Sequence, residues 1–74
     1  MSKSSNTTLN KEIVKRIKTL RKANKVTLEV FYFDTGIHIA RIEQGKTNIT
    51  VDTLYRICNY FDITFEEFFK DFKI

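Results

Sequence analysis

The hydrophobic residues of this chain recur at the three- and four-residue steps that are typical of amphipathic helices. The first such stretch starts at Asn10 and ends at Asn24-Lys25. Its apolar face is formed by Ile13, Ile17 and Leu20. The segment before it, residues 1–9, is rich in Ser, Thr and Asn, and we expect it to be a flexible tail. The folded domain is therefore predicted to span residues 10–74.

Residues that favour helix starts divide the rest of the chain into four shorter helices. A threonine can cap a helix because its side-chain oxygen accepts a hydrogen bond from a free backbone N–H of the first turn. Such residues stand at Thr27, Thr35, Thr50 and Thr64. The helices that follow them are predicted over residues 28–33, 36–44, 51–61 and 65–73. Gly45 supplies a left-handed residue that ends the helix over 36–44.

The same periodicity predicts the core. In the helix over 36–44, Ile39 and Ile42 are the buried positions. In the helix over 51–61, the apolar side is expected to hold Val51, Leu54, Ile57, Cys58 and Phe61. Because Cys58 shares that side, it is interpreted as a small buried hydrophobic residue rather than a reactive thiol.

The composition favours an all-α fold. A small all-β domain needs a tight turn every eight to twelve residues, but this chain has no proline and only two glycines. A length of 74 residues leaves room for one hydrophobic core. We therefore expect a single compact domain of five helices.

Several kinds of protein are excluded by residue counts. Cys58 is the only cysteine and His38 the only histidine, so the chain has no internal disulfide, no thiolate zinc cluster and no evident nucleophile–base pair. We expect a protein that is not an enzyme and that uses no cofactor, metal or small-molecule substrate. No apolar run approaches the roughly 20 residues that cross a bilayer, and the N-terminus lacks the apolar centre of a signal peptide. A cytoplasmic protein without a membrane partner is expected.

Charge is unevenly distributed along the chain. The net charge is +4, and residues 1–49 hold ten Lys/Arg against four Asp/Glu, a balance of +6. Residues 50–74 hold three against five, a balance of −2. A basic N-terminal part followed by a mildly acidic C-terminal part indicates a polyanion-binding face. A solvated lysine-rich helix would give the same pattern.

Three sequence pieces carry a resemblance to a known family. In one-letter code they are RIKTLR at 16–21 with Thr27 six residues later, IARIEQGK at 39–46, and TVDTL at 50–54 followed by IC at 57–58 and FDITFEEF at 61–68. Residues 16–69 thereby resemble the helix-turn-helix DNA-binding domains of the lambda-repressor/Cro type, the Xre family. The order and spacing of the pieces carry the resemblance, which covers about three quarters of the chain.

The resemblance implies a compact five-helix domain whose second and third helices form the helix-turn-helix. In that architecture the third helix lies in the major groove of double-stranded DNA. Arg21 and Glu43 stand where the family places a structural Arg–Glu pair between the first and third helices. We interpret them as holding the fold; the alternative is a DNA-contacting arginine and an unrelated acid.

The resemblance also implies which residues face DNA. The expected base-facing positions are Gly36, Ile37, His38 and Arg41. The expected phosphate-facing positions are Thr27, Leu28, Thr35, Lys46, Thr47 and Asn48. Arg41 could pair with guanine and Ile37 could lie against a thymine methyl. A solvated surface position is the alternative for His38.

Two departures from the family pattern affect this interface. Leu28 stands where the family usually has a glutamine that reaches a phosphate. The distance from Thr27 to Glu43 is about three residues shorter than usual. We predict that the second helix lost a turn and that Phe33-Asp34 forms the connection. A competing alignment makes Gly36 the turn glycine, but it leaves the third helix with about six residues, too short to read a groove well.

The C-terminal helix carries an aromatic stripe. Phe65, Phe68, Phe69 and Phe72 recur at helical spacing, and Ile74 ends the sequence given. We expect more apolar surface here than one helix can bury internally, and interpret the excess as a symmetric dimer contact. The alternative is that the first three phenylalanines complete the core while Phe72 frays.

Together these patterns predict a sequence-specific regulator of transcription, a repressor, that acts as a homodimer on nucleoid DNA. The alternative function is a protein-interaction module of the same fold, such as an antitoxin or adaptor subunit with weak or non-specific DNA binding. Its partner would be a toxin or a co-regulator. Leu28 and the Gly36-Ile37 pair favour this alternative.

Overall fold

The computed structural model describes residues 2–45 and 47–72, with side chains from Leu9 onward. Its helices are α1 Ser2–Ala23, α2 Leu28–Thr35, α3 Ile39–Glu43, α4 Val51–Tyr60 and α5 Phe65–Phe68. The described residues contain no β-strand. The expected all-α fold class is confirmed. Lys46 and Ile74, both among the predicted site residues, lie outside the described residues.

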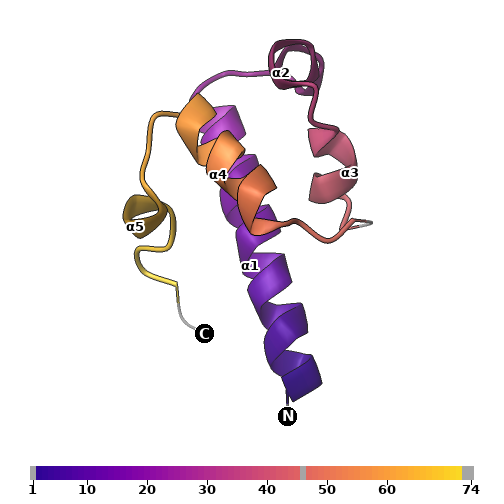
Figure 1. The fold of residues 1–74 in the computed structure, drawn as a ribbon, viewed down its shortest axis with the longest axis vertical. Helices are drawn as coiled ribbons and strands as arrows, with labels where there is room; N and C mark the ends of the chain where they lie inside the picture. The colour runs from indigo at the N-terminus through magenta and orange to yellow at the C-terminus, as the bar shows by residue number, and fades with distance from the viewer. Residues whose placement is uncertain (1, 46, 73–74) are drawn as a thin grey trace.

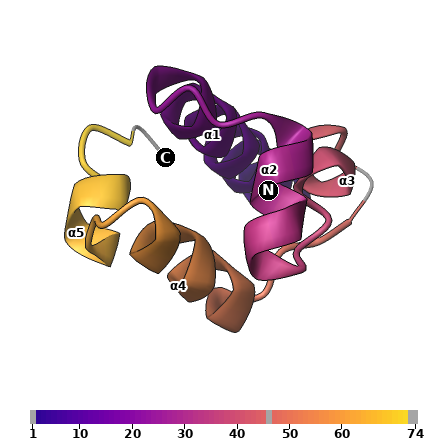
Figure 2. The same ribbon diagram turned by 90° about the horizontal axis from the view of Figure 1, so that it is seen from above.

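The helices surround one core. The long α1 forms one wall and α4 lies opposite it, with α2 and α3 on one side and α5 on the other (Figures 1 and 2). Helix α3 contacts both α1 and α2, and α5 contacts α4. The helix-turn-helix unit and the C-terminal helix therefore occupy opposite sides of the molecule.

The core is made of aliphatic residues and two fully buried phenylalanines. Its members are Ile13, Ile17, Phe31, Ile37, Ile39, Ile42, Leu54, Ile57, Cys58 and Phe68. The Phe31 ring stacks on that of Phe61 with centroids 5.8 Å apart and meets Tyr60 edge-on at 4.7 Å. Burial raises the pKa of the Cys58 thiol. The thiol therefore stays protonated at neutral pH.

One predicted core position is wrong. Val51 was expected on the apolar side of its helix, but its side chain is 73% exposed. Val51 is the first residue of α4, directly after the Thr50 cap. At that end of the helix none of the described residues covers the side chain. Helical periodicity alone does not reveal where along a helix its neighbours stop.

The first helix begins earlier than predicted, at Ser2 rather than at Asn10. Adding a residue to an existing helix costs far less than starting one, and Ser, Thr and Asn are only mildly unfavourable in helices. The stable amphipathic stretch further along can therefore extend backwards through polar residues. The C-terminal end of α1 lies within two residues of the prediction. Lys25 adopts a left-handed backbone, with φ of 57°, directly after the end of the helix.

The last helix is shorter than predicted and ends at Phe68 rather than near Lys73. Asp71 has φ of 70°, which turns the chain back on itself. The centroid of the Phe72 ring lies 5.9 Å from that of Phe68 and 5.0 Å from that of Phe69.

The aromatic stripe at the C-terminal end is only partly buried. Phe68 is fully buried, whereas Phe65, Phe69 and Phe72 are half-buried against the core and keep part of their surface accessible. The expected dimer contact through this end stays a prediction. The large exposed side chains lie on α2 and α4, at Leu28, Val30, Tyr32, Phe33, Val51 and Tyr55.

Candidate nucleic-acid interface

The turn between α2 and α3 is built around Gly36. Helix α2 starts at the Thr27 cap, whose hydroxyl accepts a hydrogen bond from the Val30 N–H at 3.1 Å. It continues through Thr35, and Gly36 then takes φ of 76° while its N–H donates to the Tyr32 carbonyl at 2.7 Å. A left-handed residue is easiest for glycine because it has no Cβ.

The predicted turn at Phe33-Asp34 is therefore wrong, and so is the predicted cap of α3 at Thr35. Thr35 is the last residue of α2, and its hydroxyl donates to the Phe31 carbonyl at 2.8 Å and accepts from the Ile37 N–H at 3.0 Å. The competing alignment with Gly36 in the turn is the one that the structure follows. Relative to the prediction, α2 is two residues longer and α3 starts three residues later.

Helix α3 is consequently only five residues long, Ile39–Glu43, not the predicted nine over 36–44. Ile39 and Ile42 are buried in the core, and Glu43 is paired with Arg21. Arg41 is the exposed charged side chain of this helix. His38 takes the N-cap position without a capping hydrogen bond from its side chain.

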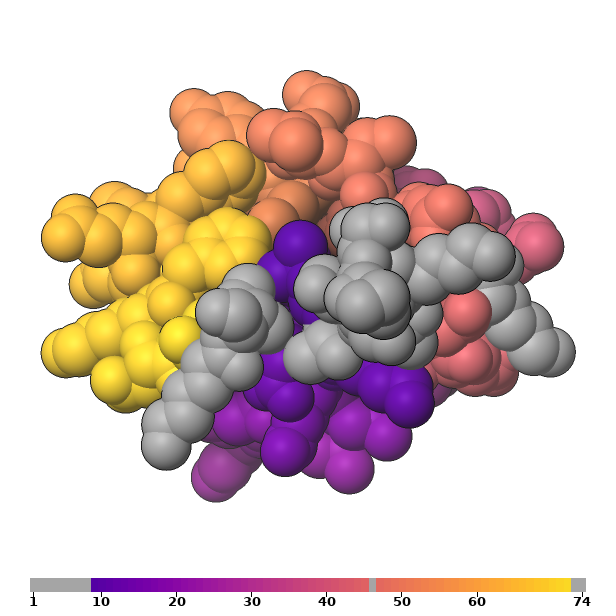
Figure 3. Space-filling view, turned by 90° about the horizontal axis from the view of Figure 1, so that it is seen from below, coloured from indigo at the N-terminus to yellow at the C-terminus, as the bar shows by residue number. Residues whose placement is uncertain are grey.

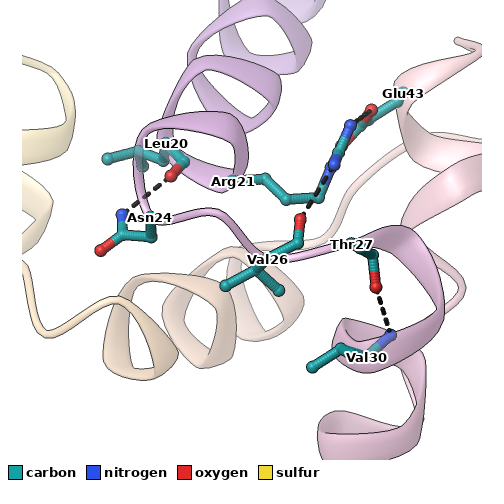
Figure 4. Close-up of polar contacts among 7 residues, drawn as sticks. All are labelled: Leu20, Arg21, Asn24, Val26, Thr27, Val30 and Glu43. Carbon is teal, nitrogen blue, oxygen red and sulfur yellow. Dashed lines mark hydrogen bonds and ion pairs between the residues drawn. The ribbon is translucent and has the colours of Figure 1, made fainter.

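A buried ion pair holds α3 against α1. Arg21 Nε donates to Glu43 Oε2 at 2.7 Å and Arg21 Nη2 donates to Glu43 Oε1 at 3.0 Å, a two-point contact (Figure 4). The remaining nitrogen, Nη1, donates to the Val26 carbonyl at 3.0 Å. The hydrogen bonding of Arg21 to the Glu43 carboxylate raises the pKa of Arg21, against a smaller opposing effect of burial. One guanidinium thus ties together α1, the link to α2, and α3.

The four expected base-facing residues divide into two groups. Ile37 is 8% exposed and belongs to the core, so the expectation that it lies against a base is wrong. It is buried because the Gly36 turn points the next residue inward. Gly36, His38 and Arg41 remain exposed. The His38 ring lies against Tyr32 with centroids 4.6 Å apart, so a residue of α2 positions it.

A hollow of about 450 Å³ joins this segment to the loop after α3. Its walls include five predicted DNA-facing residues besides Ile37, namely Gly36, His38, Arg41, Thr47 and Asn48. Two residues of α4, Thr53 and Arg56, and the apolar Ile42 and Ile49 complete it. The hollow is an open concavity with mixed polar and apolar walls, and it carries the basic side chains of Arg41 and Arg56.

A model of the helix-turn-helix family matches residues 17–68, more than two thirds of the chain. The chain belongs to the helix-turn-helix family. Within this family the chain is of the lambda-repressor-like type. Members of that type are DNA-binding domains and not enzymes. Comparison with curated proteins and with solved structures gives no match.

The start of α2 is where helix-turn-helix domains of this type often meet a phosphate. The Thr27 hydroxyl is engaged in the cap, and the Leu28 side chain is apolar and 38% exposed. Leu28 offers no hydrogen-bond donor, whereas the Thr27 hydroxyl, which accepts in the cap, keeps its own O–H as a donor. This helix start also offers a phosphate its backbone N–H groups and the positive end of the helix dipole.

Sequence reasoning missed Arg56. It lies on the exposed side of α4, and its Nη2 donates to the Thr35 carbonyl at 2.8 Å, bridging α4 to the turn of the helix-turn-helix. The available signal was a basic residue in a part of the chain, residues 50–74, whose net charge is negative. The partner of Arg56 is a backbone carbonyl, which every residue has, so the sequence contains no partner side chain from which the contact could be predicted.

No helix within residues 2–45 or 47–72 is long and apolar enough to cross a membrane. The same described part of the chain holds no cluster of three or more His, Cys, Asp or Glu that could hold a metal ion.

Proposed function

We propose that this helix-turn-helix protein binds double-stranded DNA and regulates transcription, with α3 directed into the major groove. The observation that carries the proposal is the hollow formed by Gly36, His38, Arg41, the loop at 47–48, and α4. It combines two exposed basic side chains, Arg41 and Arg56, with polar loop residues beside the helix-turn-helix. Basic side chains provide the phosphate attraction, and exposed polar side chains on α3 can read base edges.

Base reading by this protein rests on few side chains. With α3 only five residues long and two of them in the core, the exposed polar groups near its start and end are His38, Arg41 and Gln44. A bidentate arginine–guanine pair discriminates by about 1–3 kcal/mol against a wrong base. We therefore propose short half-sites with one strongly preferred position, supplemented by DNA shape.

The proposal includes a homodimeric repressor. Support comes from an apolar strip on α4, where the exposed Val51 and Tyr55 are one helical turn apart and Tyr55 meets the half-buried Phe65 edge-on at 6.0 Å. Pairing of two copies about a two-fold axis along this strip gives a symmetric contact. Two recognition helices would then meet half-sites about one DNA turn, roughly 34 Å, apart. A bound dimer of this size acts as a repressor by covering its site.

Selection from a randomised duplex pool tests the proposal, with sequencing of the retained DNA and with affinity measured from about 50 to 200 mM salt. A two-fold symmetric motif and a steep salt dependence are expected. Arg41→Gln should flatten the preference at one position of each half-site. Lys70→Gln removes the same charge from an exposed residue beyond α5 and should leave the motif unchanged. Retention without any enriched motif would contradict the specific-binding proposal.

A second candidate is a protein-interaction module such as an antitoxin or adaptor subunit. The observation that favours it is the outer surface of α2, where Leu28, Val30, Tyr32 and Phe33 are exposed and Phe33 is 88% exposed. The acids Glu29 and Asp34 lie on the same helix and would repel phosphates. Absence of duplex binding by the intact chain, at low salt, would favour this candidate.

A further inference from the structure

A second hollow lies on the other side of the α3–α4 loop. It has a volume of about 540 Å³ and separates α1 from the end of α3 and the loop. One wall carries three lysines of α1, Lys11, Lys15 and Lys18. On the face seen in Figure 3, α1 lies between α5 on one side and the α3–α4 segment on the other. We call this hollow the lysine cleft.

The wall opposite the lysines mixes polar and apolar residues, and more of the lining surface is apolar than polar. Its polar side chains are Gln44, Thr47 and Asn48, beside Ile42, Glu43, Gly45 and Ile49, while Asn10 and Val14 lie on α1 with the lysines. An amide or hydroxyl can donate to a phosphate oxygen, as a lysine ammonium can. The lysine cleft therefore presents hydrogen-bond donors on both of its sides.

The charge of the lysine cleft is positive and uncompensated. Glu43 is its one acidic residue, but its carboxylate is held by Arg21 in the two-point ion pair. The three lysines are exposed, and among the described residues none of them takes part in an ion pair. A site with three cationic side chains and a neutralised acid selects an anion.

The spacing of the lysines suits an extended anion. Positions 11, 15 and 18 follow one helix face and span about 10 Å along α1, at 1.5 Å per residue. This is about three base-pair steps of duplex DNA, whose rise is 3.4 Å. A row of cations of this length matches successive phosphates of one strand.

The lysine cleft adjoins the proposed DNA-binding hollow. Thr47, Asn48, Ile42 and Ile49 line both hollows, so the loop at 47–49 forms the ridge between them. Basic side chains therefore stand on both sides of one loop, Arg41 and Arg56 on one side and the α1 lysines on the other.

We propose that the lysine cleft binds the phosphate backbone of the DNA duplex beyond the half-site that α3 reads. This inference rests on the proposed DNA binding and extends it from the helix-turn-helix unit to α1. The cleft adds affinity without sequence preference, since phosphates are the same at every position. Such a contact offsets the small number of base contacts that a five-residue α3 allows.

The test measures affinity for a duplex of about 25 base pairs by fluorescence anisotropy, from about 50 to 200 mM salt. Each lost phosphate contact lowers the slope of log affinity against log salt by about 0.9. The variant with Lys11→Gln, Lys15→Gln and Lys18→Gln should lose about 2–3 in slope, which at about 0.1 M salt is roughly a 100- to 1,000-fold loss of affinity. The sequenced motif should stay the same.

The matched control compares Lys15→Gln with Lys70→Gln. Each removes one charge from an exposed lysine, but Lys70 directly follows α5, the helix that lies on the side of the molecule away from α3 (Figure 1). Lys15→Gln should lower the slope by about 0.9, and Lys70→Gln by less than about a third of that. Because exposed lysines contribute little to folding, both variants should unfold at the wild-type urea concentration.

Three outcomes overturn the inference. If the wild-type chain binds DNA with a steep salt slope and the triple variant keeps that slope, the lysine cleft is not a phosphate site and the proposed function stands. If the wild-type chain binds no duplex at all, both proposals fall. If the triple variant keeps DNA affinity but loses binding of inorganic phosphate in an NMR titration, the cleft takes a free anion instead.

Discussion

Two short helices, α3 and α5, dock on opposite sides of the core, and α1 holds each of them with one arginine. Arg21 reaches α3 and forms a two-point ion pair with the side chain of Glu43. Arg16, five residues earlier, reaches the end of α5 and donates to the carbonyls of Phe68 at 2.7 Å and Lys70 at 3.1 Å. Its guanidinium also lies 5.0 Å from the centre of the Phe72 ring.

The two arginines differ in burial and in the kind of partner they have. Arg21 and Glu43 are buried, with side chains 10% and 6% exposed, so each would be left as an unpaired buried charge without the other. Arg16 is half-buried and its partners are neutral carbonyls at a helix end, which water can also satisfy. The α3 attachment is therefore specific and costly to break, whereas the α5 attachment relies mainly on buried phenylalanines.

The largest expected effect comes from Arg21→Ala. Removing one member of a buried ion pair costs about 3–5 kcal/mol, because the remaining charge keeps its desolvation cost. For a domain of this size that is a large fraction of the whole unfolding free energy. Urea unfolding followed by circular dichroism measures it, and hydrogen exchange should show α3 losing protection before α5 does.

A double variant sharpens this prediction. Arg21→Met with Glu43→Leu removes both charges and should recover most of the lost stability, since replacing a buried pair by apolar residues is often neutral. Arg21→Lys should recover little, because an ammonium lacks the planar fork that makes two parallel hydrogen bonds. A loss below about 1 kcal/mol for Arg21→Ala would contradict the buried-pair interpretation.

A smaller effect is expected from Arg16→Ala, about 1–2 kcal/mol from hydrogen bonds to two carbonyls and the contact with the Phe72 ring. Hydrogen exchange should accelerate at the amides of Phe69 and Phe72 while α3 stays protected. Arg16→Lys keeps a charge near the same carbonyls and should lie between wild type and Ala. Equal losses for Arg16→Ala and Arg21→Ala would abolish the distinction between the two attachments.

The smallest effect concerns Tyr60, which links α4 to the end of α2. Its hydroxyl donates to Asp34 Oδ2 at 2.6 Å, and this hydrogen bond, with smaller effects of burial and of the Asp34 charge, raises the pKa of Tyr60. The native state therefore holds the phenolic proton more tightly than the unfolded chain does. The stability from this group is present below about pH 10 and is lost as the pH rises through the higher native pKa.

The measurement for Tyr60 is the difference in unfolding free energy between wild type and Tyr60→Phe at several pH values from about 8 to 11. The difference should favour wild type at pH 8 and shrink steadily above pH 10. Absorbance titration of the native protein should show one of the three tyrosines ionising last. A pH-independent difference would mean that the Asp34 contact does not govern this titration.

The Arg21–Glu43 pair could be anticipated because both partners are side chains at positions that the family resemblance singles out. The contacts of Arg16 and Arg56 could not, because each ends on a backbone carbonyl that any residue provides. The turn at Gly36 was also mispredicted, since Thr35 has the residue type of an N-cap but serves as the last residue of α2. Its hydroxyl finds partners at Phe31 and Ile37 instead.

Local signals in the sequence were enough to predict the elements with local causes: the all-α class, the threonine caps at Thr27, Thr50 and Thr64, and the buried periodic positions of α1 and α4 apart from Val51. These signals act within one or two helical turns and need no distant partner. The start of α3, the burial of Ile37 and the end of α5 at Phe68 follow instead from how the helices pack together. Those outcomes depend on which space in the core remains to be filled, and only the assembled helices define that space.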